Sequence, residues 1–160
     1  MMNLERGKPV KSNVSVSCVP AQPPCFSEHL SVGSIRTPVL IVDDDEDCRE
    51  LLCLFLEKRG FFCFQAEHGK SALNVMREVW VALIITDFQM PVMNGCEFLE
   101  RLSREHPQPP PAFMMTGNLT DEVRDRALKA GALMVLPKRF DRHGLSLLVE
   151  PYIRRHNRVY

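Results

Sequence analysis

The sequence contains no apolar run approaching the roughly 20 residues that a membrane-spanning helix needs, and its N-terminus lacks the apolar core of a secretory signal. These absences predict a cytoplasmic protein with no membrane partner. The chain also lacks an excess of charge, because 20 Lys and Arg residues balance 20 Asp and Glu residues. No overall field therefore draws it to nucleic acid, and any partner must be recognised locally.

The six cysteines include no CxxC pair, and without a secretory signal we expect them to be reduced. Cys18, Cys25 and His29 do not have a standard zinc spacing and no fourth ligand is evident, so we expect no zinc site there. The other four cysteines lie in apolar patterns and are predicted to act as small core residues: Cys48, Cys53, Cys63 and Cys96.

What the sequence does contain is enough apolar material for one core, since 45% of its 160 residues are hydrophobic. The apolar pattern that forms this core is absent from the first part of the chain. Residues 1–36 carry four prolines among Ser, Asn and Gln, with no sustained period of 2 or 3.6. We interpret residues 1–36 as a flexible N-terminal extension and place the domain at 37–153.

From Pro38 onward, short apolar runs recur along the chain. Runs that do not alternate with polar residues favour strands that are buried on both faces. The five predicted strands are Val39 to Val42, Phe61 to Phe64, Val81 to Ile85, Ala112 to Met115 and Leu133 to Leu136.

Apolar residues at helical spacing follow the first three runs. The members of these stripes are Cys48, Leu51, Leu52, Phe55 and Leu56, then Ala72, Val75, Met76 and Val79, then Phe98, Leu99 and Leu102. Gly60 stands where a helix C-cap glycine is favoured, and the third stripe follows Asn94 and Gly95. Each stripe predicts an amphipathic helix.

Two further helices are predicted from their ends. Thr120 can cap a fourth helix that Gly131 terminates, and Asp141 can cap a fifth. Pro151 lacks a backbone donor and clashes one turn back, so we expect a kink or a stop near Glu150. Five alternations of strand and helix predict an α/β fold with a parallel sheet covered on both faces.

Polar residues follow these runs, at the carboxyl ends where open parallel sheets bind ligands. They are Asp43, Asp44, Asp87, Thr116 and Lys138. Taken alone, the acidic run from Asp43 to Asp47 is typical of a solvated turn that caps a helix. Three carboxylates brought together by a sheet would instead need a cation, and Mg²⁺ prefers such oxygen ligands.

Thr116 and Lys138 add a hydroxyl and a positive charge to the same crevice. A carboxylate can attack phosphorus when the charge that develops on the phosphoryl oxygens is neutralised. Asp87 is the natural nucleophile of such a site, and the other residues would surround it.

Four segments together resemble the receiver domain of two-component response regulators over about residues 37–150: VLIVDDDED, TDFQMPVMNG, MMTGN and GALMVLPKRF. The resemblance implies a flavodoxin-like, doubly wound sheet of five parallel strands in the order 2-1-3-4-5. It implies that Asp87 accepts a phosphoryl group, in a reaction that requires magnesium, from a histidine kinase or a histidine phosphotransfer protein.

The resemblance also assigns the surrounding residues. Asp44 and Asp87 would ligate Mg²⁺ directly, Asp43 through water and Gln89 through its backbone carbonyl. Lys138 and Thr116 would hold the phosphoryl oxygens, helped by backbone near Gly117. In this family the hydroxyl residue moves toward the phosphoryl group and changes partner affinity on the face of the fourth helix, fifth strand and fifth helix.

Two residues depart from the family pattern. Val135 stands where the family usually has Tyr or Phe, and Arg139 where it usually has proline, often after a cis peptide bond. Valine lacks the reach and rotamer change of the aromatic switch, while a cis bond without proline is costly. Gln89 and Asn118 occupy positions whose side chains tune self-dephosphorylation in the family.

Because the fifth helix lies near the end of the sequence, we expect no output domain, and a receiver that acts by docking or phosphorelay. Residues 154–160 form a short basic tail, for which nucleic-acid binding is not expected.

Two alternative functions stay open. One is an interaction module independent of phosphorylation. The other is an aspartyl-phosphate phosphohydrolase, in which Asp43 of the Asp43–Asp45 DxD motif would be the nucleophile. In the leading interpretation, the protein has no enzymatic activity beyond self-phosphotransfer and self-dephosphorylation.

Overall fold

The structure of the chain is a computed structural model that describes residues 36–139 and 142–156. Side chains of the last helix are described only between residues 144 and 152. The predicted extension, apart from Arg36, and the predicted Asp141 cap lie outside the described residues. The described elements belong to one compact unit.

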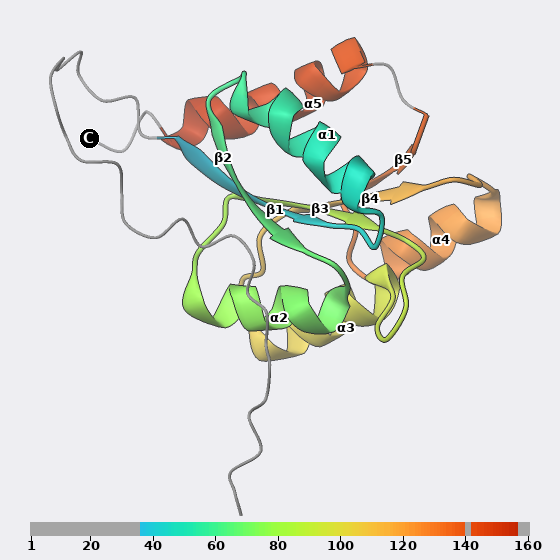
Figure 1. Cartoon of the computed structure of the whole chain (residues 1–160). Coiled ribbons are helices and arrows are strands. Elements are labelled where there is room, and N and C mark those ends of the chain that lie inside the picture. The colour runs from blue at the N-terminus through green and yellow to red at the C-terminus, as the bar shows by residue number, and fades with distance from the viewer. Residues whose placement is uncertain (1–35, 140–141, 157–160) are drawn as a thin grey trace, which may run out of the picture. The chain divides into compact units, whose positions relative to one another are not determined.

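Strands and helices alternate five times along the chain, as predicted. The strands are β1 (Thr37–Val42), β2 (Phe61–Ala66), β3 (Leu83–Asp87), β4 (Ala112–Thr116) and β5 (Met134–Pro137). The helices are α1 (Glu46–Glu57), α2 (Gly69–Glu78), α3 (Gly95–Glu105), α4 (Asp121–Lys129) and α5 (Arg142–His156). All neighbouring strands pair in parallel in the order β2-β1-β3-β4-β5, which confirms the expected topology (Figure 1).

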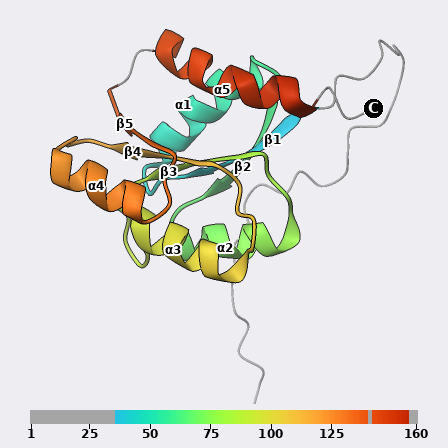
Figure 2. The ribbon, with the colours of Figure 1, turned by 180° about the vertical axis from the view of Figure 1, so that it is seen from behind.

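The sheet separates two apolar layers. On one face, α1 and α5 bury residues such as Leu56 and Leu145 against the strands, and on the other α2, α3 and α4 bury residues such as Leu73, Phe98 and Ala127. Figure 2 shows the same arrangement from behind, with α5 and α1 on one side of the sheet. This layering follows from β-strand geometry, because successive side chains point to opposite faces.

Burial on both faces holds for β1, β3 and β4, whose residues are buried almost without exception. The same expectation is wrong for β2 and β5, because these strands form the edges of the sheet. Phe62 of β2 is 41% exposed, and no residue of β5 is fully buried. The third strand also starts at Leu83 rather than at Val81.

The helix ends match their sequence signals. The Thr120 hydroxyl accepts a hydrogen bond from the Val123 N–H and caps α4. Gly131 ends α4 with a φ of 107°, while the next N–H reaches back to Ala127, the pairing of a Schellman motif. In α1 the predicted stripe is right for Leu52 and Leu56 but wrong for Leu51, which is 53% exposed.

Of the kink or stop expected near Glu150, the stop is wrong, because α5 continues through Pro151 to His156. Residues 154–156 of the predicted tail are therefore helical. Packing explains the continuation, because Val149 is buried and the Tyr152 ring contacts Phe113 at 5.7 Å between centroids. Leu147, whose carbonyl loses a donor to the proline, is exposed, so water can replace that bond. None of the described helices combines the length and apolar character needed to cross a membrane.

Gly95 lets the start of α3 approach the end of β3. Its N–H donates to the Phe88 carbonyl at 3.2 Å. A Cβ atom at residue 95 would collide with the Asp87 carbonyl oxygen and would lie 3.3 Å from Met114 Cε. The backbone of Asp87 is therefore held in place by a contact that only glycine permits.

We predict that Gly95→Ala lowers the free energy of unfolding by about 1–3 kcal/mol, because the obstructing atoms are backbone and must shift. Denaturant unfolding measures this change. Gly144→Ala in α5 is the matched control, since a Cβ there meets nothing within 4 Å and alanine is the better helix former. Equal stability of the two variants would contradict the proposed close contact.

Candidate functional site

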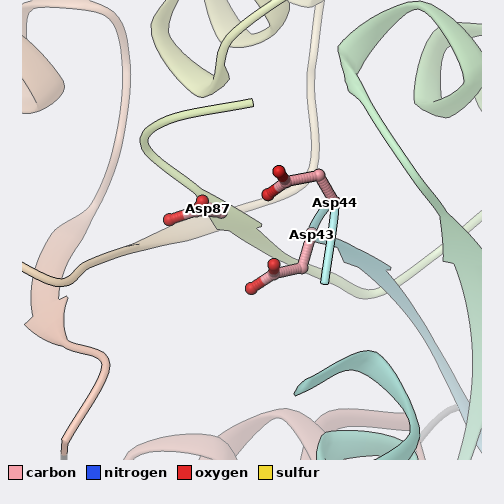
Figure 3. A group of neighbouring side chains, drawn as sticks. All are labelled: Asp43, Asp44 and Asp87. Carbon is pink, nitrogen blue, oxygen red and sulfur yellow. The ribbon is translucent and has the colours of Figure 1, made fainter. Parts of the chain in front are cut away.

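The carboxyl ends of four strands bring the predicted polar residues to one edge of the sheet. Asp43 and Asp44 follow β1, Asp87 ends β3, Thr116 ends β4 and Lys138 follows β5. One oxygen from each of the three aspartates lies within 4.8 Å of the others. Figure 3 shows the three carboxylates turned toward the same side.

Lys138 bridges two of these carboxylates. Its Nζ lies 3.0 Å from Asp43 Oδ2 and 3.0 Å from Asp87 Oδ2. The described part of the chain contains no cis peptide bond, so the bond to Arg139 is trans. The flexible stem of lysine spans the distance without the proline that is usual in the family. Lys138 therefore reaches both carboxylates although Arg139 stands in place of the usual proline.

Asp43 is fully buried and only partly satisfied. Its Oδ1 accepts hydrogen bonds from the Asp45 N–H at 3.0 Å and from Lys138 Nζ at 3.2 Å. Its Oδ2 has Lys138 Nζ beside it as an ion pair, but no donor with hydrogen-bond geometry. A buried carboxylate oxygen of this kind retains capacity for a cation or for a water bound to one.

Asp87 is 3% exposed, and its Oδ1 accepts a hydrogen bond from the Phe88 N–H at 2.8 Å. Burial raises the pKa of Asp87 above its ordinary value, although the neighbouring Lys138 opposes that rise. Burial alone would lower the pKa of Lys138, yet the hydrogen bonds and charges of Asp43 and Asp87 raise it well above its usual range. Lys138 is thus firmly protonated, and the site keeps a fixed positive charge.

Thr116 lies at the expected strand end and is 3% exposed. Its hydroxyl accepts a hydrogen bond from the Asn118 N–H and donates one to the Asn118 carbonyl, both at 3.2 Å. The hydroxyl is thus engaged within the loop after β4. To donate to any other acceptor, the hydroxyl must give up its bond to the Asn118 carbonyl, whereas it can keep the bond it accepts. Gly117 and the Asn118 side chain lie exposed in the same loop.

An open pocket of about 430 Å³ adjoins the acidic cluster. Asp44 and Gln89 line it, together with Asn94 and Arg126. Sequence reasoning missed Arg126, because an arginine in an exposed helix carries no signal that it faces a site. It also did not anticipate that Phe88, besides orienting Asp87 through its N–H, would lie beneath the Arg126 guanidinium, 5.7 Å from its ring centroid.

The first departure from the family pattern also has a clear place in the fold. Val135 is half-buried on β5 and packs against the core on the side of α2, α3 and α4. Its short, branched side chain has one strongly preferred rotamer in most settings, so it offers no large rotation toward Thr116. Arg139 is exposed beyond the strand.

Comparison with known proteins agrees with this geometry. The family model described as the response regulator receiver domain matches residues 39–150. The chain is 34% identical over 118 residues to the phosphate regulon transcriptional regulatory protein PhoB of Escherichia coli, covering 73% of this chain and 52% of PhoB. It is 36% identical over 116 residues to an uncharacterised 14.6 kDa protein of Leptolyngbya boryana, covering 71% of this chain and 88% of that protein.

Among solved structures, the chemotaxis response regulator CheY4 of Vibrio cholerae superposes with a TM-score of 0.67 at 27% identity, covering 73% of this chain and 98% of CheY4. The match to PhoB extends over about half of that relative's length. The similarity therefore concerns the domain that carries the acidic cluster.

The close approach of the three carboxylates leads to a prediction for the free energy of unfolding. Asp87→Asn should raise the free energy of unfolding at pH 7 without divalent cations, by on the order of 1 kcal/mol, because asparagine keeps the shape and removes a buried charge. The folded pKa of Asp87 is raised, so the folded state binds the proton more tightly. Ionised Asp87 therefore costs stability above the raised pKa, and this cost is relieved as pH falls through it.

Thermal unfolding of the wild type and of Asp87→Asn, from pH 7 down through the raised pKa of Asp87, measures this difference in stability. Asp125→Asn, an exposed change on α4, should alter stability by less than about 0.5 kcal/mol. A clear loss of stability in Asp87→Asn would mean that the ion pair with Lys138 outweighs the burial of the charge.

Proposed function

The chain belongs to the response regulator receiver domain family, and from that premise we propose that Asp87 accepts a phosphoryl group from a phosphohistidine of a kinase or of a histidine phosphotransfer protein. The observation that carries the proposal is the position of Lys138 between Asp43 and Asp87, at 3.0 Å from each. A fixed cation held there can neutralise charge that arrives on Asp87.

In this reaction a carboxylate oxygen of Asp87 forms the new bond to phosphorus. The bond between phosphorus and the imidazole nitrogen breaks, and the imidazole leaves with the electron pair. The Phe88 N–H orients Asp87 through Oδ1. Lys138 favours the ionised carboxylate that attack requires and offers its charge to the phosphoryl oxygens.

Mg²⁺ is the proposed cofactor, with Asp44 and Asp87 as direct ligands, Asp43 acting through water and Gln89 contributing its backbone carbonyl. Two features fit this assignment: the three carboxylate oxygens that gather within 4.8 Å and the buried Asp43 Oδ2 without a hydrogen bond. When bound, the ion supplies positive charge to the oxygens of the transferring group.

Thr116 and the backbone near Gly117 complete the proposed phosphoryl site. Gln89 and Asn118 have exposed amide side chains that can orient the water for hydrolysis of the acyl phosphate. We propose no enzymatic activity beyond self-phosphotransfer and self-dephosphorylation. The proposal includes a cytoplasmic location, because its phosphodonors are made from ATP inside the cell.

We propose that the phosphorylated domain signals by docking on the face formed by α4, β5 and α5, or by passing the phosphoryl group along a relay. Apolar side chains are exposed on these elements and on the turn before β5, namely Leu128, Leu133 and Leu147. A protein partner that covered these leucines would gain apolar contact area. Since Val135 cannot turn as an aromatic would, the change at this face is proposed to pass through the loop of Thr116.

The phosphohydrolase alternative requires Asp43 as nucleophile and Asp45 as its partner in the motif. The Asp45 carboxylate instead caps α1, accepting hydrogen bonds from the Asp47 and Cys48 N–H groups. Asp43 is fully buried behind Lys138. The engagement of Asp45 in this cap favours Asp87 as the acceptor, and the intact acidic cluster favours a phosphorylated module over an inert one.

We predict that acetyl phosphate with Mg²⁺ adds one phosphoryl group to the protein, as an acid-labile, hydroxylamine-sensitive adduct detected by intact mass. Asp87→Asn should abolish the adduct, whereas Asp43→Asn should slow its formation and leave it on Asp87. The reverse pattern would support the phosphohydrolase. A wild-type protein that stays unlabelled would support the phosphorylation-independent module.

We also predict that Mg²⁺ alone raises the thermal midpoint, because a ligand that binds only the folded state stabilises it. Asp44→Asn should weaken Mg²⁺ binding by at least about tenfold, as judged from the concentration dependence of the midpoint. Glu46→Gln removes an exposed carboxylate from the first residue of α1 and should leave the affinity within about twofold. If the two variants bind Mg²⁺ equally, the ligand assignment is wrong.

A further inference from the structure

Arg126 of α4 is a positive charge on the solvent side of the acidic cluster. It lines the pocket of about 430 Å³ that Asp44 and Gln89 also line. Its guanidinium carbon lies 5.7 Å from the centroid of the Phe88 ring.

The Arg126 guanidinium has no ion pair and no side-chain hydrogen bond with any residue that the structure describes. Other arginines of the domain are engaged: Arg49 with the Asp43 carbonyl, Arg77 and Arg101 with Glu105, and Arg124 with Asp121. A guanidinium presents five donors in a planar fork that fits phosphate oxygens. The contact with the Phe88 ring holds this fork at the pocket without using its donors.

We propose that Arg126 is a specificity-determining residue that binds the phosphoryl oxygens of the incoming donor and favours small donors with two negative charges. The inference rests on the proposed function of Asp87. Lys138 lies against Asp43 and Asp87, so its charge is already engaged by carboxylates. Among the described residues that line the pocket, Arg126 alone is an arginine or a lysine.

Arg126 holds the donor with equal strength before and during the transfer step, so its role is binding. The donor phosphoryl group enters the pocket and is held by the guanidinium. An Asp87 oxygen then bonds to phosphorus, while the donor's leaving group departs with the electron pair of the broken bond, as acetate in the case of acetyl phosphate. An interaction made equally before and during transfer changes the half-saturating donor concentration and leaves the maximal rate unchanged.

The test compares two donors, acetyl phosphate, a dianion at neutral pH, and phosphoramidate, whose protonated nitrogen leaves one net negative charge. Labelling of Asp87 is followed by intact mass over a range of donor concentrations in saturating Mg²⁺. The variants are Arg126→Ala, Arg126→Lys and, as the matched control, Arg124→Ala, which removes an exposed arginine from the same helix.

For Arg126→Ala we expect the half-saturating concentration of acetyl phosphate to rise about five- to tenfold, with the maximal rate within about twofold of wild type. The value for phosphoramidate should change by less than about twofold, since the donor carries less charge. Arg126→Lys should recover part of the loss, because lysine keeps the charge without the fork. Arg124→Ala should match wild type with both donors.

A second measurement does not depend on turnover. Acetonylphosphonate, a non-transferable analogue of acetyl phosphate, is titrated into the full chain with Mg²⁺ and followed by NMR chemical shifts. Its dissociation constant should rise in Arg126→Ala by the same factor as the half-saturating concentration. Equal constants for Arg126→Ala and Arg124→Ala, or a reduced maximal rate at unchanged half-saturation, would overturn the assignment. Loss of labelling in the wild type would refute the proposed function instead, and the analogue titration would still decide the role of Arg126.

Discussion

Mutual repulsion among three carboxylates is the constraint on which the site depends. Asp43 and Asp87 are buried, and the oxygens they present with Asp44 lie within 4.8 Å of one another. Lys138 offsets part of this repulsion from inside the cluster by reaching both buried carboxylates. The cluster keeps a net negative charge, because one lysine faces three carboxylates. This charge suits a domain whose proposed chemistry begins when a cation and a phosphoryl group bind.

Holding such a cluster together requires a rigid frame, and the fold supplies one through backbone contacts. Asp87 ends a strand whose residues are all buried. Its carbonyl lies against Gly95 at the start of α3, and its carboxylate is oriented by the next N–H along the chain. Asp43 is fixed in a similar way, because its Oδ1 accepts the Asp45 N–H in the turn that begins α1. The geometry of the site is therefore a property of strand ends and helix starts.

Several features were predictable from sequence because they depend on local chemistry. The buried strands could be read from unalternating apolar runs, and Thr120 and Gly131 from helix-capping preferences. Predictions failed where the outcome depended on neighbours. β2 and β5 proved to be edge strands, so their apolar residues are partly exposed. Pro151 did not end α5, because the packing of Val149 and Tyr152 holds the helix on both sides of it.

The sequence by itself determined the α/β alternation and the identities of Asp43, Asp44, Asp87, Thr116 and Lys138, since apolar patterning and chemical type can be read from the residues themselves. Only the tertiary structure decided how these groups meet. It placed Lys138 against two carboxylates, with a trans peptide bond between Lys138 and Arg139. It also turned the Thr116 hydroxyl toward Asn118. It also brought Arg126 from α4 to the mouth of the pocket. Contacts between residues far apart in the chain depend on the packing of whole elements, and no local pattern encodes that packing.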